Sequence, residues 1–145
     1  PYETVAYEVY SLINSFSGVG IGRIGSLEKE MDLSSFLNHV KKQLNSNIVR
    51  HSPPSKKLIK KVAVVAGSGS FAIEDAKRQG AAAFITADLK YHQFYQGEKS
   101  VLLVDVGHYE SEQYVKNLIF DYLTKKLPNF AFVLSQTKTN PVNYF

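Results

Sequence analysis

The sequence has no cysteine among its 145 residues. This absence excludes a disulfide framework, a metal site built from thiolates and a cysteine nucleophile. No stretch is apolar over the ~18 residues that a membrane-spanning helix needs, so we expect no membrane partner. No signal peptide is visible, but the first residue is Pro1 rather than methionine, so we expect a removed N-terminus or a fragment. A cytoplasmic protein is the default expectation.

Apolar residues make up 44% of the chain, which is typical of a globular domain rather than a disordered segment. The net charge is +4, and much of the positive charge comes as separate lysine pairs along the chain. Nucleic-acid proteins more often gather basic residues on one face with aromatic residues between them. The scattered pairs therefore favour solvated surface lysines, and we do not expect a nucleic-acid partner.

Strand-like and helix-like runs alternate through the second half of the chain. We expect strands at 58–67, 81–88 and 100–107, helices at 70–80 and 111–127, and a short helix or turn at 89–98. The strands are apolar on both faces, as in parallel sheets covered by helices. We therefore predict an α/β fold, a layered sheet with mostly parallel strands flanked by helices.

The remaining segments give weaker patterns. We expect strands at 4–12 and 129–136, a loop or bulged edge at 15–27, a helix at 32–45 and a polar turn at 50–57. Asp32 and Ser34 are both candidates for the N-cap of the helix at 32–45.

Ligands of such sheets bind at the carboxyl ends of the strands, and each central strand is followed by polar or glycine residues. After the first, Gly67 and Gly69 form a possible anion-binding loop or simply a tight turn, since the P-loop lysine is absent. After the second come Thr86, Asp88 and His92. They are candidates for a site, although Thr86 or Asp88 could equally cap a helix and His92 could be a surface residue.

The third strand is followed by "DVGHYESE", in which His108 and Glu112 are four residues apart. Imidazole and carboxylate are normal ligands of Zn, Mn, Fe or Mg, and Asp105 could hydrogen-bond the imidazole from behind. The alternative is a capping box, in which Ser111 or Glu112 stabilises the start of a helix. Two ligands alone fall short of the three that a tight site needs.

Six segments, in chain order, together resemble a known family. They are "PYETVAYEVY", "GVGIGRIGSL", "KKVAVVAGSGS", "GAAAFITADLKYH", "LLVDVGHYESE" and "TNPVNYF". They resemble the C-terminal part of the Nif-three-like dinuclear-metal family, whose members are often labelled "GTP cyclohydrolase 1 type 2 homologue". The resemblance implies that residues 15–145 form the second core domain of that fold, and that 1–14 form the terminal strand of an inserted domain.

The resemblance also implies the roles of individual residues. His108 and Glu112 would be ligands in a centre of two divalent ions (Zn, Mn, Fe or Mg) per full-length subunit. Thr86, Asp88 and His92 would line the same cavity. The family usually has glycine where this chain has Ala87, which weakens that motif.

The family's other ligands, a His-His pair and an Asp, belong to its N-terminal half. We therefore expect this chain alone to bind divalent metal weakly and to be catalytically inactive. The resemblance implies a homo-oligomeric, hexameric ring for the full-length protein and a metal-dependent hydrolase acting on a nucleotide or phosphoester. A non-catalytic, metal-responsive scaffold or regulatory binding protein is the alternative. No residue pattern in the sequence identifies guanine as the substrate.

Overall fold

The computed structural model describes residues 20–144, which form one five-stranded mixed sheet in the order β1-β3-β4-β5-β2. Three parallel strands form its centre: β3 (Ile59–Ser68), β4 (Ala83–Ala87) and β5 (Leu102–Asp105). β1 (Arg23–Met31) and β2 (Arg50–His51) pair antiparallel at the two edges. The predicted α/β class is confirmed. The strand expected at 4–12, and the boundary expected at residue 14, lie outside the described residues.

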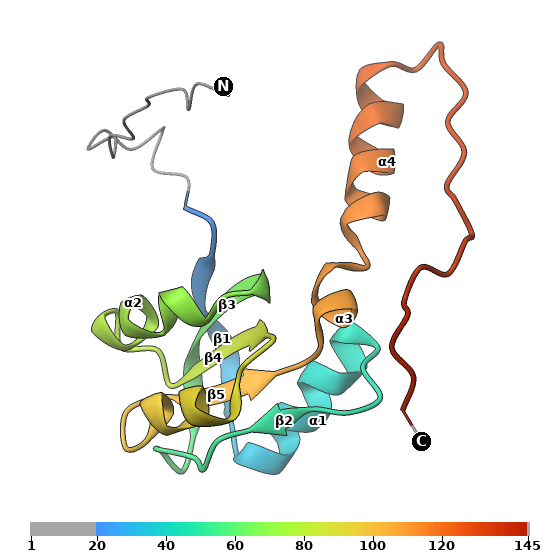
Figure 1. The fold of residues 1–145 in the computed structure, drawn as a ribbon. Helices are drawn as coiled ribbons and strands as arrows, with labels where there is room; N and C mark the ends of the chain where they lie inside the picture. The colour runs from blue at the N-terminus through green and yellow to red at the C-terminus, as the bar shows by residue number, and fades with distance from the viewer. Residues whose placement is uncertain (1–19, 145) are drawn as a thin grey trace, which may run out of the picture.

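Helices cover both faces of the sheet (Figure 1). They are α1 (Leu33–Leu44), η1 (Ser70–Ala72) leading into α2 (Ile73–Arg78), η2 (Tyr91–Gly97), α3 (His108–Glu112) and α4 (Val115–Lys126). None of the helices in the described part of the chain is long and apolar enough to cross a membrane.

Successive residues of the central strands pack into two separate hydrophobic clusters. Phe84 of β4 packs in the cluster that contains Ile73 of α2. The next residue, Ile85, packs in the cluster that contains Phe36 and Val40 of α1. Because side chains alternate between the two faces of a strand, a sheet covered on both sides needs apolar residues at every position. This explains the continuous apolar runs in the sequence.

The parallel register brings the carboxyl ends of the central strands to one edge. Ser68 lies opposite Ala87, and Thr86 lies opposite Asp105. The residues that follow these strands, including Asp88 and His108, therefore meet at the same end of the sheet, as expected for this fold class.

Two predictions about the last third of the chain are wrong. The helix expected at 111–127 is divided into α3 and α4, and α3 already begins at His108. The segment 129–136 is not a strand but irregular chain that runs back beside α4 (Figure 1). Phe132 and Leu134 are half-buried while Ala131 and Val133 are exposed, so the alternation is real. A strand also needs a hydrogen-bonded neighbour, and this segment has none among the described residues.

The predictions for two segments at the sheet edges are only partly correct. The polar turn expected at 50–57 begins with the two-residue strand β2, whose Arg50 and His51 pair with β5. Polar residues in so short a strand leave no periodic pattern. The expected loop or bulged edge at 15–27 includes the start of β1, an edge strand with a register shift between Ser26 and Met31.

The helix expected at 32–45 is confirmed as α1, and Asp32 rather than Ser34 is its N-cap. The Asp32 carboxylate accepts hydrogen bonds from the Ser35 backbone N–H at 2.9 Å and from the Ser35 hydroxyl at 2.8 Å. The bond from the Ser35 N–H satisfies a backbone donor that a helix start leaves without a partner. Both bonds hold the pKa of the Asp32 carboxyl below its usual value.

We predict that Asp32→Ala lowers the melting temperature, whereas Asp32→Asn keeps most of it, because asparagine is an equally good N-cap. A lowered pKa in the folded state stabilises the fold above the unfolded pKa of ~3.9. That contribution is lost as the pH falls through the folded-state pKa. Thermal unfolding of the three proteins between pH 2 and 7 checks this. An Asn variant as unstable at pH 7 as the Ala variant would contradict the capping role.

Candidate metal centre

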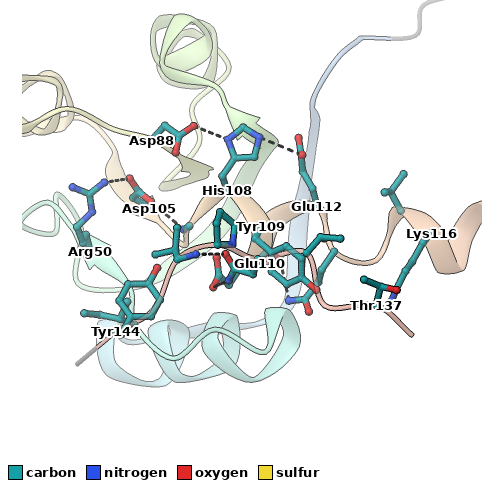
Figure 2. A pocket seen from close by; sticks show the side chains of 18 of the residues that line it. Arg50, Asp88, Asp105, His108, Tyr109, Glu110, Glu112, Lys116, Thr137 and Tyr144 are labelled. Atoms are coloured by element: carbon teal, nitrogen blue, oxygen red, sulfur yellow. Dashed lines mark hydrogen bonds and ion pairs between the residues drawn. The ribbon is translucent and has the colours of Figure 1, made fainter. Parts of the chain in front are cut away.

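His108 lies between two carboxylates at the carboxyl edge of the sheet (Figure 2). Its Nδ1 is 2.6 Å from Asp88 Oδ2, and its Nε2 is 3.3 Å from Glu112 Oε2. Asp88 directly follows β4, whereas His108 and Glu112 are the first and last residues of α3. Residues four apart in a helix share a face, so the start of α3 at His108 is what brings Glu112 beside the imidazole.

The two ring nitrogens of His108 have separate partners. On the Nε2 side, the 3.3 Å separation from Glu112 suits two donors of one ion, each at ~2.0–2.2 Å from zinc. On the Nδ1 side, Asp88 occupies the position from which a carboxylate orients a metal-binding imidazole. The donor chemistry therefore fits a divalent ion. Within residues 20–144, however, no three acidic or histidine side chains gather as a complete ligand set.

Asp88 also sets the protonation of His108. The hydrogen bond from the ring to Asp88 raises the His108 pKa above 6.5, and the charges of Asp88 and Glu112 add to this, while partial burial opposes it. Asp88 has a left-handed backbone conformation, with φ +58°. Asp and Asn tolerate this conformation better than most residues, which suits an acidic residue at this turn.

Gly67, at the end of β3, leaves the space that His108 and Glu112 occupy. A Cβ at this position would lie 2.5 Å from Glu112 Oε1 and 3.3 Å from His108 Cε1. Its φ is +62°, a conformation that glycine adopts freely. Its backbone N–H donates to the Ser111 hydroxyl at 2.8 Å, and this hydroxyl donates to the His108 carbonyl oxygen at 2.8 Å.

These contacts bear on two alternatives that the sequence leaves open. Ser111 does not cap the helix that follows "DVGHYESE", because it lies inside α3 and links this helix to β3. Since the Gly67 N–H already has Ser111 as its partner, the structure favours the tight turn over the anion-binding loop. At Gly69 a Cβ would overlap Thr86 Oγ1, so this glycine also serves close packing.

The expectation that the Asp105 carboxylate hydrogen-bonds His108 is wrong. The carboxylate that bonds His108 is that of Asp88. Asp105 is only 3% exposed. One oxygen accepts from the Leu89 N–H at 2.8 Å, the other from the Gly107 N–H at 3.1 Å. Leu89 directly follows Asp88, and Gly107 directly precedes His108. Asp105 therefore fixes the two turns that carry the Asp88–His108 pair.

Arg50 completes this arrangement and was missed by the sequence analysis. Its guanidinium forms an ion pair with Asp105 and donates to the Leu89 carbonyl oxygen at 3.1 Å. It also lies over the Phe94 ring, 5.5 Å from the ring centre. The register of β2 on β5 places Arg50 opposite Asp105, and no sequence pattern indicates that pairing.

Thr86 and His92, the other two residues expected to line the cavity, are not among the residues that line it. Thr86 is fully buried, and its hydroxyl donates to the Gly67 carbonyl oxygen at 3.0 Å. It lies beneath the site and supports the turn after β3. His92 is exposed on η2 and does not line the cavity next to His108.

A cavity of about 810 Å³ lies beside the pair, with residues from the sheet edge and α3 on one side and from 135–144 on the other. Asp88, Asp105, His108 and Glu112 all line it. The wall also contains Glu110, which the sequence analysis overlooked although it lies within "GHYESE". An acidic residue in the first turn of a helix is ordinarily exposed, so no signal marked this one as buried.

The fold and the site define an α/β domain that presents a His–Glu pair suited to a divalent metal at the carboxyl edge of its sheet. Residues 3–141 match the family model described as Duf34/NIF3 (NGG1p interacting factor 3), and the chain belongs to this family. The resemblance noted from the sequence motifs is thereby confirmed.

A relative from Bacillus subtilis (strain 168) bears the name "GTP cyclohydrolase 1 type 2 homolog". It is 37% identical over 149 residues, which cover 99% of this chain and 40% of the relative. A relative of the same name from Halalkalibacterium halodurans is 34% identical, with the same coverage. The chain thus spans about two fifths of the length of these relatives.

Solved structures agree with the fold. A Bacillus cereus protein related to NIF3 superposes with a TM-score of 0.75 at 34% identity, covering 100% of this chain and 41% of its own. A Staphylococcus aureus protein gives the same TM-score at 29% identity, covering 87% of this chain and 42% of its own. These matches confirm the α/β core domain of this family.

We predict that Gly67→Ala weakens zinc binding by roughly tenfold, the scale of changes that misplace a ligand side chain, because its Cβ displaces Glu112. Gly80→Ala is the matched control: Gly80 has φ +74° but no atom within 4 Å of the added Cβ. Both variants pay about 1–2 kcal/mol of left-handed strain. Urea unfolding and zinc titration check this, and equal zinc affinities in the two variants would contradict it.

We predict that the His108 pKa of the metal-free chain lies above 6.5 and falls more in Asp88→Asn than in Glu112→Gln. Asp88 is the larger cause of the raised pKa, through its hydrogen bond, and Glu112 is the smaller. NMR titration of the His108 ring signals provides the measurement. A larger fall in Glu112→Gln would show that the ring does not bond Asp88.

Proposed function

We propose that this chain forms part of a dinuclear metal-dependent hydrolase that acts on a nucleotide or phosphoester. The observation that carries the proposal is the His108–Glu112 pair, with Asp88 on the opposite ring nitrogen. Metal-binding histidines commonly have a carboxylate at the ring nitrogen that faces away from the metal, and ligand sites are commonly large cavities such as the one beside this pair. The name of the B. subtilis relative, "GTP cyclohydrolase 1 type 2 homolog", supports a nucleotide substrate.

Each residue of the site then has a role. His108 Nε2 and the Glu112 carboxylate hold the metal, and Asp88 keeps the proton on Nδ1, so that the Nε2 lone pair is free. Asp105 and Arg50 fix the turns from which Asp88 and His108 project. Two bound divalent ions would supply Lewis acidity and a water with a lowered pKa.

The described residues provide two of the donors that such a centre needs. We propose that further donors come from polypeptide outside residues 20–144, and that the complete protein is a homo-oligomeric ring.

A metal-responsive scaffold without catalysis is the second candidate. The observation that favours it is α4, none of whose residues is buried among the described ones. Four of its large apolar residues are exposed: Val115, Leu118, Ile119 and Tyr122. The helix extends away from the sheet (Figure 1), as expected of an element that packs against another polypeptide in an assembly.

The test is the metal content of the full-length protein, measured by elemental mass spectrometry, followed by turnover of a nucleotide panel. We expect about two equivalents per subunit, with a sharp fall in His108→Ala and Glu112→Ala. His39→Ala is the control, since His39 is exposed on α1 and does not line the cavity. Metal-dependent turnover that is lost in His108→Ala would establish the hydrolase.

Two outcomes would count against the hydrolase. Bound metal without turnover of any nucleotide would favour the scaffold. Metal content unchanged in both ligand variants would show that "GHYESE" is only a strand-to-helix turn.

For the 145-residue chain alone, we predict weak zinc binding and no hydrolysis, because a tight zinc site needs at least three protein ligands. Competition titration against a chromophoric chelator gives the affinity, and the same nucleotide panel gives the activity. Two tight zinc sites on this chain would contradict the proposed incomplete ligand set.

A further inference from the structure

Both proposed metal ligands belong to α3, a helix of only five residues. His108 is its first residue and Glu112 is its last. A helix this short is not stable by itself, so its direction is set by its contacts with the rest of the fold. Whatever holds α3 against the sheet therefore also determines where the two side chains lie.

Ser111, the residue before Glu112, joins α3 to the end of β3. Its hydroxyl accepts from the Gly67 N–H at 2.8 Å and donates to the His108 carbonyl oxygen at 2.8 Å. A hydroxyl has a single hydrogen to donate, and here the backbone of His108 receives it. One side chain thus fixes the start of α3 relative to the last residues of β3.

The carbonyl oxygen of Gly67 is held by a second hydroxyl, that of Thr86, which donates to it at 3.0 Å. Thr86 belongs to β4 and is fully buried. The pairing of β3 with β4 shifts register between Val64 and Ser68, so Gly67 lies in an irregular stretch of its strand. Irregularities of this kind disrupt the ladder of backbone bonds and often lie beside functional sites. Here two side-chain hydroxyls bind the backbone N–H and carbonyl of one glycine.

Gly67 is also the backbone against which both proposed ligands rest. A Cβ on it would lie 2.5 Å from Glu112 Oε1 and 3.3 Å from His108 Cε1, so a shift of this glycine would move the carboxylate relative to the imidazole. Binding sites need their side chains placed to within about 0.5 Å. Thr86 and Ser111 do not line the cavity themselves. Their hydroxyls reach the site only through the backbone that they hold.

We propose that Thr86 and Ser111 are positioning residues of the metal site. Their hydroxyls fix the backbone of Gly67 at its carbonyl and at its N–H, and Gly67 sets the separation between His108 Nε2 and the Glu112 carboxylate. The inference rests on the proposed function, because it names residues that shape the same metal site. It gives Thr86 a role in the site that requires no contact with the cavity.

The test is a zinc titration of the 145-residue chain and its variants against a chromophoric chelator, with urea unfolding of the same proteins. Thr86→Val removes one hydroxyl and keeps the branched shape of the side chain. Ser111→Ala removes the other hydroxyl at a half-buried helix position. We expect each variant to bind zinc about tenfold more weakly, the scale for residues that support metal ligands. Thr86→Ser keeps the hydroxyl and should bind zinc as the original chain does.

Ser52→Ala is the matched control. Ser52 is only 1% exposed, its hydroxyl accepts from the Leu103 N–H at 2.9 Å, and it does not line the cavity. This variant should lose stability in urea and keep its zinc affinity. A role of Thr86 and Ser111 that is only structural would lower the urea midpoint of their variants and leave the zinc affinity of the folded chain unchanged, which would overturn the proposal. Failed rescue in Thr86→Ser, or an equal loss of zinc affinity in Ser52→Ala, would also overturn it.

The double variant Thr86→Val/Ser111→Ala shows whether the two hydroxyls act through the same glycine. Groups that share one partner are not independent, so their losses should not add. We expect the double variant to bind zinc more tightly than the product of the two single losses predicts. Fully multiplicative losses would show that Gly67 is not the common element.

A measurement without metal separates this inference from the proposed function. In NMR spectra of the metal-free chain, a nuclear Overhauser contact should join Gly67 Hα to the His108 ring, and it should weaken in Thr86→Val and Ser111→Ala but not in Ser52→Ala. If zinc binding depends on His108 but neither this contact nor the zinc affinity responds to the two hydroxyls, the positioning role is wrong and the metal centre remains. If the contact responds but zinc binding does not depend on His108, the hydroxyls position the imidazole and the proposed function is wrong.

Discussion

The geometry of the whole site depends on one buried carboxylate, that of Asp105. It sits at the end of the central strand β5 and accepts from a side chain of β2 and from two backbone N–H groups, at Leu89 and Gly107. A buried charge in a protein must be paired and hydrogen-bonded, and removing one partner of such a pair typically destabilises strongly. Three segments far apart in the sequence are thereby held together at the carboxyl edge of the sheet.

Asp105 therefore fixes the positions of two side chains, Asp88 and His108, that have few other restraints. Asp88 and His108 are about half-exposed, and each is adjacent in sequence to a backbone group that Asp105 binds. The imidazole is therefore positioned from its Nδ1 side, which leaves Nε2 facing Glu112, where we propose that a metal ion binds. Gly67 supplies the space for that pair. The Asp105 charge does not contact Glu112 or the imidazole, and it still determines where the proposed metal ligand His108 lies, as supporting residues of metal sites commonly do.

Much of this could be predicted from the sequence, and the failures have physical causes. Strands that are apolar on both faces predicted the parallel sheet covered by helices. The family motifs indicated His108 and Glu112 as candidate metal ligands. The segment 129–136 alternates like a strand but has no hydrogen-bonded neighbour among the described residues, and pairing is not encoded locally. The roles of Asp88 and Asp105 were exchanged, because which carboxylate reaches the imidazole depends on backbone angles. The pairing of Arg50 with Asp105 could not be predicted for a similar reason, because only the β2–β5 register places the two residues opposite each other.

The central claim is that His108 Nε2 and Glu112 together bind a divalent metal while Asp88 holds Nδ1. The most direct measurement is a crystal structure of this chain soaked in zinc, with anomalous data collected at the zinc edge. The account predicts an anomalous peak within bonding distance of His108 Nε2 and Glu112, with the Asp88–Nδ1 hydrogen bond retained. Zinc bound only at His39, His51 or His92, or at His108 Nδ1 in place of Asp88, would contradict it.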